Sequence, residues 1–460
     1  MIDVKQVRAN PERLKEIIRQ RKVDPSKADV DAWLKLDEKR RDLQAKLEAL
    51  QAEQNKSSTL WNVDKEAARN QGRELREKLR AIEEELSEVS EKGQAIFDWF
   101  PNWIDPNMPV GESDADNVLE CAWVPNSGYI DKNKLQDNAK CAELMPKKLL
   151  YAKDADFTPV GYADLGERLG IDTPQGGKVS GSRFAYILGD VAVMQMALAH
   201  LLTEKLLNDG FQPIIPPLLV RERALYGTSH FPEGRDQVYV IKTHNVEDEH
   251  QLHLVGSSEP ANFSYFMDKT INEAELPIKV FAYTPCFRSE AGSWGKDVKG
   301  IKRVHQFDKI EMNAVCTPEQ SDSIYQQFKD VNEWLLQTLK LPYRIIDKCT
   351  GDAGYLATYR QRDVEVWLPA SREFLETMTD TNTTDYQARR LNIRYKSEQG
   401  KPQYCHTVND TCCAMGRMLI AIIENYQQAD GSILIPEALR AFMKKEYILP
   451  MFREKQAVRS

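Results

Sequence analysis

One stretch of the chain combines side chains that bind anions, stack on flat rings and accept hydrogen bonds. It reads FRSEAGSWGKDVKGIKRVHQFDKIEM. Alternate side chains of a strand share a face, so we expect Arg288 and Glu290 on one face of a first strand. By the same rule Phe307, Lys309 and Glu311 share a face of a second strand. Guanidinium, aromatic ring and carboxylate together suit a ligand with a flat ring at one end and a small polar group at the other.

The loop that would join these two strands is rich in cations and in glycine. Its members are Gly292, Gly295, Lys296, Lys299, Gly300, Lys302 and Arg303. Because glycine gives a loop conformational freedom, the pattern predicts a mobile cationic lid suited to a polyanion. A solvated hairpin whose charges bind no ligand is the alternative interpretation.

Two further stretches supply polar groups of the kind that bind a small amino compound. LVGSSEPANF places Ser257 and Glu259 in a predicted loop. NDTCCAMGRMLIAIIENYQ begins with Asn409 and Thr411, residue types that cap helices, and continues as an apolar helix. An arginine near the start of a buried helix is costly unless it meets an anion, which makes Arg417 a candidate anion-binding residue.

The composition limits the class of protein. The chain has 460 residues, 42% of them hydrophobic, and a formal charge of -8, enough for one large domain and a smaller one. No apolar run approaches the ~20 residues that span a bilayer, and the N-terminus lacks a secretory signal. We therefore expect a cytoplasmic protein that does not bind membranes. Eight cysteines include no CxxC pair and the histidines form no HxxxH motif, so we expect neither a disulfide framework nor zinc.

The N-terminal quarter carries two heptad seams. The first runs through Trp33, Leu36, Arg40, Leu43, Leu47 and Leu50. The second runs through Leu75, Leu79, Ile82, Leu86, Val89, Gly93 and Ile96. Two matching seams joined by a short polar turn predict an antiparallel helical hairpin, in which a helix of 25 to 30 residues extends roughly 40 Å. Such a hairpin is either an arm for a large partner or an oligomerisation coiled coil.

A second architecture follows the stretch FPNWIDPNMPVGESDADNV, whose Pro, Asn, Asp and Gly content marks a domain boundary. We place an N-terminal domain at 1–112 and a larger domain at 113–460. The pattern predicts a helix over 189–208, followed by an extended, Pro-containing segment at a sheet edge. Strand-like runs then dominate at 278–290, 305–315, 343–349, 362–369 and 374–381. This order predicts an antiparallel α+β fold, and no GxGxxG or GxxxxGK[ST] phosphate loop is present.

Together these stretches resemble the signature motifs of class II aminoacyl-tRNA synthetases, and specifically of the seryl-tRNA synthetase family. The opening stretch looks like motif 2, the NDTCCAMGR stretch like motif 3, and the helix with GFQPIIPPLLV like motif 1. GSSEP resembles the serine loop, and the helical hairpin is similar to the arm that binds the long variable arm of tRNA(Ser). The resemblance implies an antiparallel-sheet class II catalytic domain preceded by a helical, coiled-coil arm.

The resemblance also implies ATP contacts at matched positions. These are Arg288, Glu290, Arg303, Phe307, Glu376, Thr379 and Arg417. Arg288 would lie on the α-phosphate, Glu290 on the adenine amino group and Arg417 on the γ-phosphate. Phe307 would stack on the base.

Serine contacts are implied in the same way. The matched positions are Ser257, Glu259, Arg288, Glu311, Asn409 and Thr411. Ser257 and Glu259 would meet the serine amino group, and Glu311 its hydroxyl. Arg288 would lie close to the serine carboxylate. Ser257 stands where threonine is usual in the family.

The implied activity is that of an ATP-dependent serine–tRNA ligase that forms AMP and diphosphate. Its partners would be L-serine, ATP with Mg²⁺ at Glu376 and Thr379, tRNA(Ser), tRNA(Sec), and a second copy of the chain in a homodimer. A non-catalytic synthetase paralogue and a ligase that loads amino acids onto carrier proteins are the alternatives.

Overall fold

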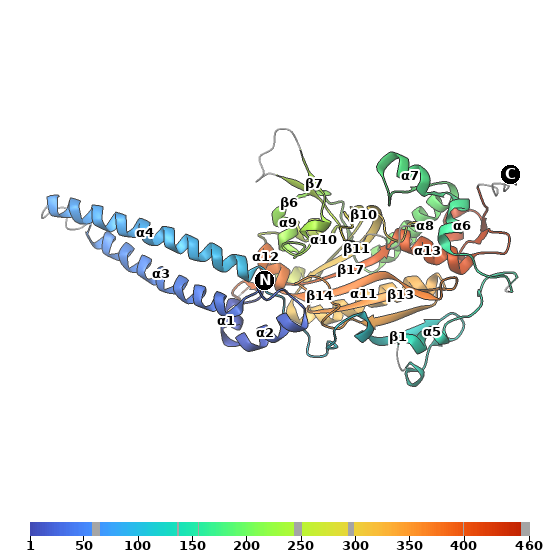
Figure 1. Ribbon diagram of the computed structural model, residues 1–460, viewed down its shortest axis with the longest axis horizontal. Coiled ribbons are helices and arrows are strands. Elements are labelled where there is room, and N and C mark those ends of the chain that lie inside the picture. Colours follow the sequence, from blue (N-terminus) through green and yellow to red (C-terminus); the bar gives the residue numbers. More distant parts are fainter. Residues whose placement is uncertain are drawn as a thin grey trace. The chain divides into compact units, whose positions relative to one another are not determined.

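The protein is described from a computed structural model that covers residues 1–57, 65–135, 138–154, 156–242, 251–292, 299–398 and 400–451 (Figure 1). The chain divides into two compact units, Met1–Trp103 and Ile104–Ser460. Residues 104–112 therefore belong to the compact body of the second unit.

The first unit is helical. Its helices are α1 (Val4–Ala9), α2 (Pro11–Gln20), α3 (Val30–Ser57) and α4 (Lys65–Phe97). The antiparallel pairing of α3 and α4 predicted from the two seams is confirmed: the Trp33 and Phe97 rings stack at 5.2 Å, and Lys39 forms an ion pair with Glu85 at 2.7 Å. The expected turn between the helices lies outside the described residues.

The polar member of the first seam has a local partner. Arg40 Nη2 lies 3.3 Å from Oδ1 of Asp37, one turn earlier in α3. Asp37 is 5% exposed and also accepts two hydrogen bonds from the Arg8 guanidinium, at 2.7 and 2.8 Å. A bidentate pair of this kind fixes α1 against α3. Arg40, the polar residue that interrupts the apolar seam, therefore joins the ion pair that holds these two helices together.

The second unit is built on a sheet of nine strands in the order β2-β1-β12-β13-β14-β17-β11-β10-β5. All neighbours are antiparallel except β5 and β10. The strands are β1 (Val118–Val124), β2 (Gly128–Tyr129), β5 (Gln212–Pro213), β10 (Ile278–Phe287), β11 (Gln306–Cys316), β12 (Tyr343–Asp347), β13 (Arg360–Leu368), β14 (Glu373–Thr384) and β17 (His406–Ala414). The predicted antiparallel α+β fold is confirmed.

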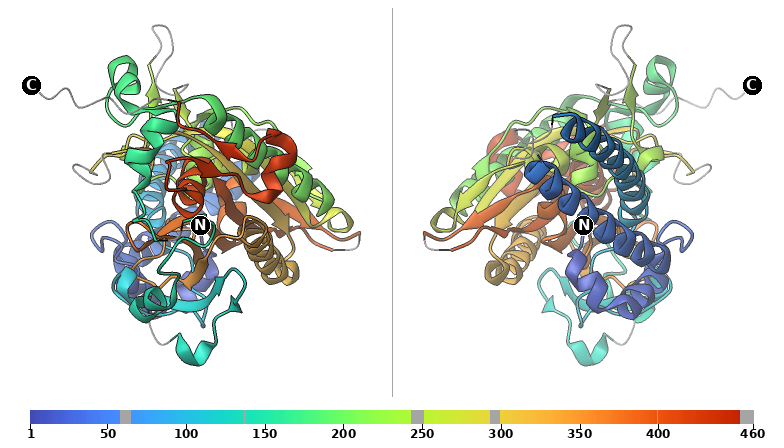
Figure 2. Two further views of the ribbon diagram at one scale, coloured as in Figure 1. Left: turned by 90° about the vertical axis from the view of Figure 1, so that its right-hand side faces the viewer. Right: turned by 90° about the vertical axis from the view of Figure 1, so that its left-hand side faces the viewer.

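Helices cover both faces of this sheet. One face carries α8 (Gly189–Asn208) and α13 (Met415–Tyr426), and the other carries α11 (Pro318–Thr338), drawn in gold in Figure 2. The predicted helix over 189–208 is confirmed as α8. Burial of α13 is almost complete because both its sheet-facing and its outer side chains pack in the core, including Leu419, Ile420 and Ile423.

Smaller elements surround one end of the sheet. They include the strands β6 (Leu219–Arg221), β7 (Val240–Ile241) and β8 (Leu252–Leu254) and the helices α9 (Glu222–Gly227), α10 (Glu259–Ser264) and α12 (Tyr386–Leu391). The Pro-containing segment after α8 divides between two sheets: Gln212–Pro213 forms the edge strand β5, as expected, whereas Leu219–Arg221 pairs with β8.

The remaining elements are short. They are α5 (Asn138–Leu144), α6 (Tyr162–Leu169), α7 (Thr173–Ser180), α14 (Glu437–Met443), β3 (Ile171–Asp172), β4 (Tyr186–Ile187), β9 (Thr270–Asn272), β15 (Arg394–Lys396), β16 (Gln403–Tyr404), β18 (Ile433–Leu434) and β19 (Tyr447–Ile448). Of the helices in the described ranges, none has the length and apolar character to cross a bilayer.

Candidate active site

The strands β10 and β11 and the loop between them form one end of the site, but the first strand is shorter than predicted. Strand β10 ends at Phe287, so Arg288 and Glu290 lie in the loop beyond it and do not share a strand face. Glu290 has a left-handed backbone, with φ of 51°, which ends the alternation. Backbone bonding between Arg288 and His305 (N···O 3.0 Å) continues past the strand and holds Arg288 close to β11.

The alternation predicted along β11 is confirmed. Phe307 and Lys309 line one cavity, and Glu311 forms an ion pair with Lys309 on the same face. Strand β17 runs beside β11, with Thr411 opposite Glu311 and Asn409 opposite Asn313. The predicted helix-capping role of Asn409 and Thr411 is therefore wrong, because both lie within β17 and helix α13 begins only at Met415.

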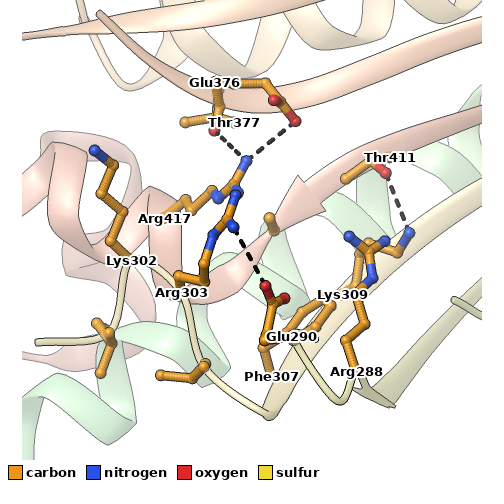
Figure 3. Close-up of a pocket in the computed structure, with 14 residues that line it drawn as sticks. Arg288, Glu290, Lys302, Arg303, Phe307, Lys309, Glu376, Thr377, Thr411 and Arg417 are labelled. Carbon is orange, nitrogen blue, oxygen red and sulfur yellow. Dashed lines mark hydrogen bonds and ion pairs between the residues drawn. The ribbon is translucent and has the colours of Figure 1, made fainter. Parts of the chain in front are cut away.

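A cavity collects most of the residues matched to ATP (Figure 3). It is lined by Arg288, Glu290, Ile301, Lys302, Arg303, Val304, Phe307, Lys309, Glu376, Thr377, Thr411, Ala414, Gly416 and Arg417. These residues come from β11, β14, β17, the first turn of α13 and both ends of the lid loop between β10 and β11. Of the predicted ATP-binding residues in the described part of the chain, only Thr379 is outside this lining.

Two arginine–glutamate pairs lie in the cavity (Figure 3). Arg417 Nη1 donates to the backbone oxygen of Glu376 at 2.9 Å and to its Oε1 at 3.1 Å. Arg303 Nη1 lies 3.5 Å from Oε2 of Glu290. The Arg288 guanidinium lies 5.4 Å from the centre of the Phe307 ring. Three guanidinium groups and one aromatic face thus border a single opening, as a nucleotide polyphosphate requires.

A second cluster of polar side chains is buried next to this cavity, and Lys309 belongs to both. The Lys309 ammonium donates to Ser257 Oγ at 2.9 Å and to Thr411 Oγ1 at 3.2 Å, and it pairs with Glu311. Lys309 and Glu311 are 4% and 2% exposed. A buried ion pair with hydroxyl partners on both sides forms a fixed polar surface at the inner end of the site.

Glu259 forms the opposite side of this cluster. Its Oε1 accepts hydrogen bonds from Gln387 at 2.6 Å and from Asn409 at 3.2 Å. Burial, and after it the charge of Glu311, raises the pKa of Glu259 to about 8. All six residues matched to serine therefore either belong to this cluster or, like Arg288, lie in the adjoining cavity.

Glu376 and Thr379 have the donor types that Mg²⁺ prefers. The Thr379 hydroxyl oxygen lies 2.8 Å from Asp363 Oδ1 and 3.2 Å from Glu376 Oε1, and its single hydrogen can be donated to either carboxylate. Although burial alone would raise the pKa of Glu376, Arg417, Lys348 and Arg288 hold it below its ordinary value, so this carboxylate is ionised. Two protein oxygens suit an ion whose other ligands are phosphates and water. Within the described residues, no three His, Cys, Asp or Glu side chains gather so that they could hold a metal by themselves.

Two residues of the site had no role in the sequence analysis. Lys309 was placed on the correct face, but its partners Ser257 and Thr411 lie 52 and 102 positions away. Gln387, which holds Glu259, is 128 positions from it and has no signal in the local sequence. Of the predicted lid, Lys296 lies outside the described residues and Lys299 is exposed.

The fold and this pairing of a nucleotide-type cavity with a buried polar cluster define the core of a class II aminoacyl-tRNA synthetase. The sequence model of the tRNA synthetase class II core domain (G, H, P, S and T) matches residues 239–426, and that of the seryl-tRNA synthetase N-terminal domain matches residues 1–104. The chain belongs to the seryl-tRNA synthetase family.

Individual relatives agree with this assignment. The serine–tRNA ligase of Dictyoglomus turgidum is 37% identical over 98% of this chain and 100% of its own length. The seryl-tRNA synthetase of Pyrococcus horikoshii, solved with ATP, has a TM-score of 0.86 and 33% identity, over 98% of this chain and 100% of that one. The cytoplasmic serine–tRNA ligase of Naegleria fowleri, solved with AMP, has a TM-score of 0.80 and 27% identity, over 96% of each chain.

The raised pKa of Glu259 predicts how serine binding depends on pH. Below about pH 8 the free site holds Glu259 protonated, so an ammonium ligand must displace that proton, and KM for serine should fall as pH rises toward about 8. Glu259→Gln should raise this KM by roughly tenfold or more and remove its pH dependence in this range. Serine-dependent ATP–diphosphate exchange measures both, with KM for ATP as the control. A flat wild-type profile would contradict the assignment.

Lys309 should be required for serine activation, because it neutralises Glu311 in the same cluster. Lys309→Met leaves Glu311 buried without its cation, and kcat/KM for serine should drop roughly 100-fold. Lys309→Arg should restore part of this loss. Thermal unfolding and ATP binding verify that each variant is folded. Unchanged kinetics in folded Lys309→Met would show that Lys309 has no part in serine binding.

Proposed function

We propose that this protein is a serine–tRNA ligase that activates L-serine with ATP and transfers it to the 3′ end of tRNA(Ser). One observation carries the proposal: a cavity bordered by three arginines and a phenylalanine opens directly onto a buried cluster of Lys309, Glu311 and Ser257. The first matches a nucleotide polyphosphate, and the second matches a small amino acid with a hydroxyl group. Membership of the seryl-tRNA synthetase family supports both.

In the first step the serine carboxylate attacks the α-phosphorus of ATP. A P–O bond forms to serine, the bond to the bridging oxygen breaks, and diphosphate leaves with its electron pair, giving seryl-adenylate. The carboxylate is already ionised, so positioning and charge stabilisation supply the catalysis. Arg288 would stabilise the α-phosphate, Phe307 would stack on the adenine beside Glu290, and Arg417 would leave Glu376 to bind the γ-phosphate.

Magnesium belongs to this step as a partner of ATP. When bound, Mg²⁺ neutralises phosphate charge, and Glu376 and Thr379 would provide its protein oxygens. In the free protein Glu376 is hydrogen-bonded to Arg417. Movement of Arg417 toward the phosphates would therefore free the Glu376 carboxylate to bind the ion. Arg303 would add a further phosphate or ribose contact at the cavity mouth.

Serine selection would rest on the buried cluster. Glu259 and Ser257 would bind the amino group, and Glu311 with Thr411 would bind the hydroxyl. Alanine lacks that hydroxyl and would leave buried polar groups without a partner, which costs far more than a lost apolar contact. Asn409 would keep Glu259 in place.

The second step would join the two units in function. The terminal ribose hydroxyl of tRNA attacks the carbonyl carbon of seryl-adenylate, and AMP leaves. The unit Met1–Trp103 would form the tRNA-binding part, with the α3–α4 hairpin on the long variable arm of tRNA(Ser), and the unit Ile104–Ser460 the catalytic part. Because tRNA(Sec) shares a long variable arm, it would be a second substrate.

The proposed setting is a cytoplasmic homodimer. Exposed apolar residues support dimerisation: Met196 and Leu207 on α8 are 59% and 49% exposed, and Ile215, which follows the edge strand β5, is 99% exposed. Apolar side chains exposed at a sheet edge are typical of subunit interfaces.

The two alternatives fit less well. A non-catalytic paralogue would lack part of the charged constellation, yet Arg288, Glu290, Phe307 and Arg417 line one cavity. A ligase for carrier proteins would not need a hairpin of a 28-residue and a 33-residue helix.

ATP–diphosphate exchange tested with each of the twenty amino acids separates these proposals. We expect exchange with serine and little with alanine or threonine, and aminoacylation of tRNA(Ser) in the same preparation. Arg417→Ala should abolish exchange while the protein stays folded. No serine-dependent exchange would refute the enzyme proposal, and exchange without tRNA charging would favour the carrier-protein alternative.

Charge reversal tests the arm. Arg73 and Arg80 of α4 are each 82% exposed, and Arg73→Glu/Arg80→Glu should raise KM for tRNA(Ser) by about tenfold and leave serine exchange unchanged. The matched opposite change, Glu77→Arg/Glu84→Arg, should not weaken tRNA binding. Deletion of residues 30–98 should remove charging and keep exchange. Normal charging by the deletion variant would refute the arm.

A further inference from the structure

The loop that carries Glu290 is held by a separate segment of the chain. This segment comprises Arg235–Gln237, a single turn of 3₁₀ helix, and Val238 and Tyr239, which lead into β7. Gln237 is not among the residues that line the nucleotide cavity, and the proposed reaction gives it no role.

Gln237 bonds to the residues on both sides of Glu290. Its backbone oxygen accepts a hydrogen bond from the Ser289 amide at 2.9 Å, and its Nε2 donates to the Ala291 backbone oxygen at 3.1 Å. The Ser289 hydroxyl also donates to the backbone oxygen of Asp236. These bonds fix the main chain immediately before and immediately after Glu290.

The residue between these bonds has a backbone conformation that needs support. Glu290 is left-handed, with φ of 51°, a region that side chains other than Asn and Asp rarely adopt. Such a conformation persists where the surrounding contacts fix it. Because the backbone of Glu290 sets the direction of its side chain, the bonds from Gln237 help to direct the carboxylate into the cavity. There its Oε2 lies 3.5 Å from Arg303 Nη1 (Figure 3).

The segment around Gln237 is itself fixed in the fold. Val238 packs against an apolar cluster that includes Phe231. Burial, and after it the charge of Glu290, raises the pKa of Tyr239, so the Tyr239 phenol lies within electrostatic reach of the same carboxylate. Gln237 therefore holds the Glu290 loop from a packed part of the second unit.

The end of the loop that carries Arg303 has a different anchor. The Tyr162 hydroxyl donates to the Lys299 backbone oxygen at 3.1 Å, and Gly300, with φ of 73°, lies against the Tyr162 ring. The Tyr162 amide donates to Glu424 Oε1 at 3.1 Å. Since this anchor does not bond to the residues beside the adenine contact, it offers a comparison for the bonds of Gln237.

We propose that Gln237 is a positioning residue for Glu290, and that by holding Glu290 it determines how strongly the site selects the 6-amino group of adenine. Glu290 is the residue expected to accept a hydrogen bond from that amino group. A carboxylate that is already held in place makes this bond at little entropic cost, whereas a carboxylate that must first be ordered binds less well. The role rests on the proposed function, because it requires ATP to bind with its base beside Phe307 and Glu290.

Purine riboside 5′-triphosphate tests the inference, because it is ATP without the 6-amino group. The full-length wild type should bind ATP with Mg²⁺ roughly 30-fold more tightly than this analogue, the effect of losing a hydrogen bond to a charged acceptor. Gln237→Met keeps the length of the side chain but removes the donor. It should weaken ATP binding roughly tenfold and binding of the analogue by less than about twofold. Calorimetric titration measures both dissociation constants, and KM for serine in the exchange assay should stay within about twofold of wild type.

Three matched variants separate positioning from a general effect on the fold. Gln237→Glu keeps the shape but replaces the donor by an acceptor that faces the Ala291 oxygen, so it should lose the preference for ATP at least as strongly as Gln237→Met. Tyr162→Phe, at the other anchor, should change the binding of both nucleotides by the same factor. Gln326→Met, on the exposed side of α11 where the amide bonds to Asp330 at 2.9 Å, should bind both as the wild type does. Thermal unfolding verifies that each variant is folded.

Equal binding of ATP and the analogue by the wild type would overturn the inference, as would an unchanged preference for ATP in Gln237→Met. Loss of affinity for both nucleotides by the same factor in Gln237→Met would show that Gln237 only supports the fold, and would also overturn the selective role. If the wild type shows no serine-dependent exchange, the proposed function fails. The calorimetric comparison needs no serine and still judges Gln237 independently.

Discussion

The hydrogen-bonded register of β11 against β17 is the constraint on which the active site depends. It sets Glu311 opposite Thr411 and brings Lys309, from the same face of β11, within 3.2 Å of the Thr411 hydroxyl. A shift by one residue would turn Asp410 into the site and Thr411 out of it. Strand β17 also pairs with β14 on its other side, which fixes the same register. The central strands therefore form one rigid sheet with different side chains on its two faces.

Local sequence predicted the structure correctly where the pattern lay within a single strand or helix. The period-two pattern of Phe307, Lys309 and Glu311 predicted a shared face, and the two heptad seams predicted the helical hairpin, because both patterns express burial on a regular backbone. Local sequence failed at Glu290, whose left-handed backbone interrupts the alternation. It also failed along 406–414, where Asn409 and Asp410 have weak strand preference and β17 forms by pairing with its neighbours. The contact of Gln387 with Glu259 and the placement of Asp380 opposite Asp410 could not be predicted, since each depends on pairing between distant parts of the chain.

The two faces of the central sheet neutralise their buried charges in different ways. On the serine face, Lys309 lies between Glu311 and two hydroxyl groups, so cation and carboxylate meet directly. On the other face, Arg362 is shared by Glu120 and Asp380 at distances longer than a hydrogen bond. A ligand that enters the cavity can replace partners on the first face, whereas Arg362 and Asp380 on the second face are buried and do not line the cavity.

The pairing of Arg417 with Glu376 has a consequence for selectivity among nucleotides. In the free protein both groups already have a partner, at 3.1 Å. A ligand that binds Arg417 breaks this contact, and a phosphate accompanied by a divalent cation would supply a new anion for the arginine and a new cation for the carboxylate. In the proposed mode of ATP binding, Arg417 would exchange Glu376 for the γ-phosphate and Glu376 would exchange Arg417 for Mg²⁺, whereas adenosine and AMP, which lack that phosphate, would leave the Arg417–Glu376 pair in place.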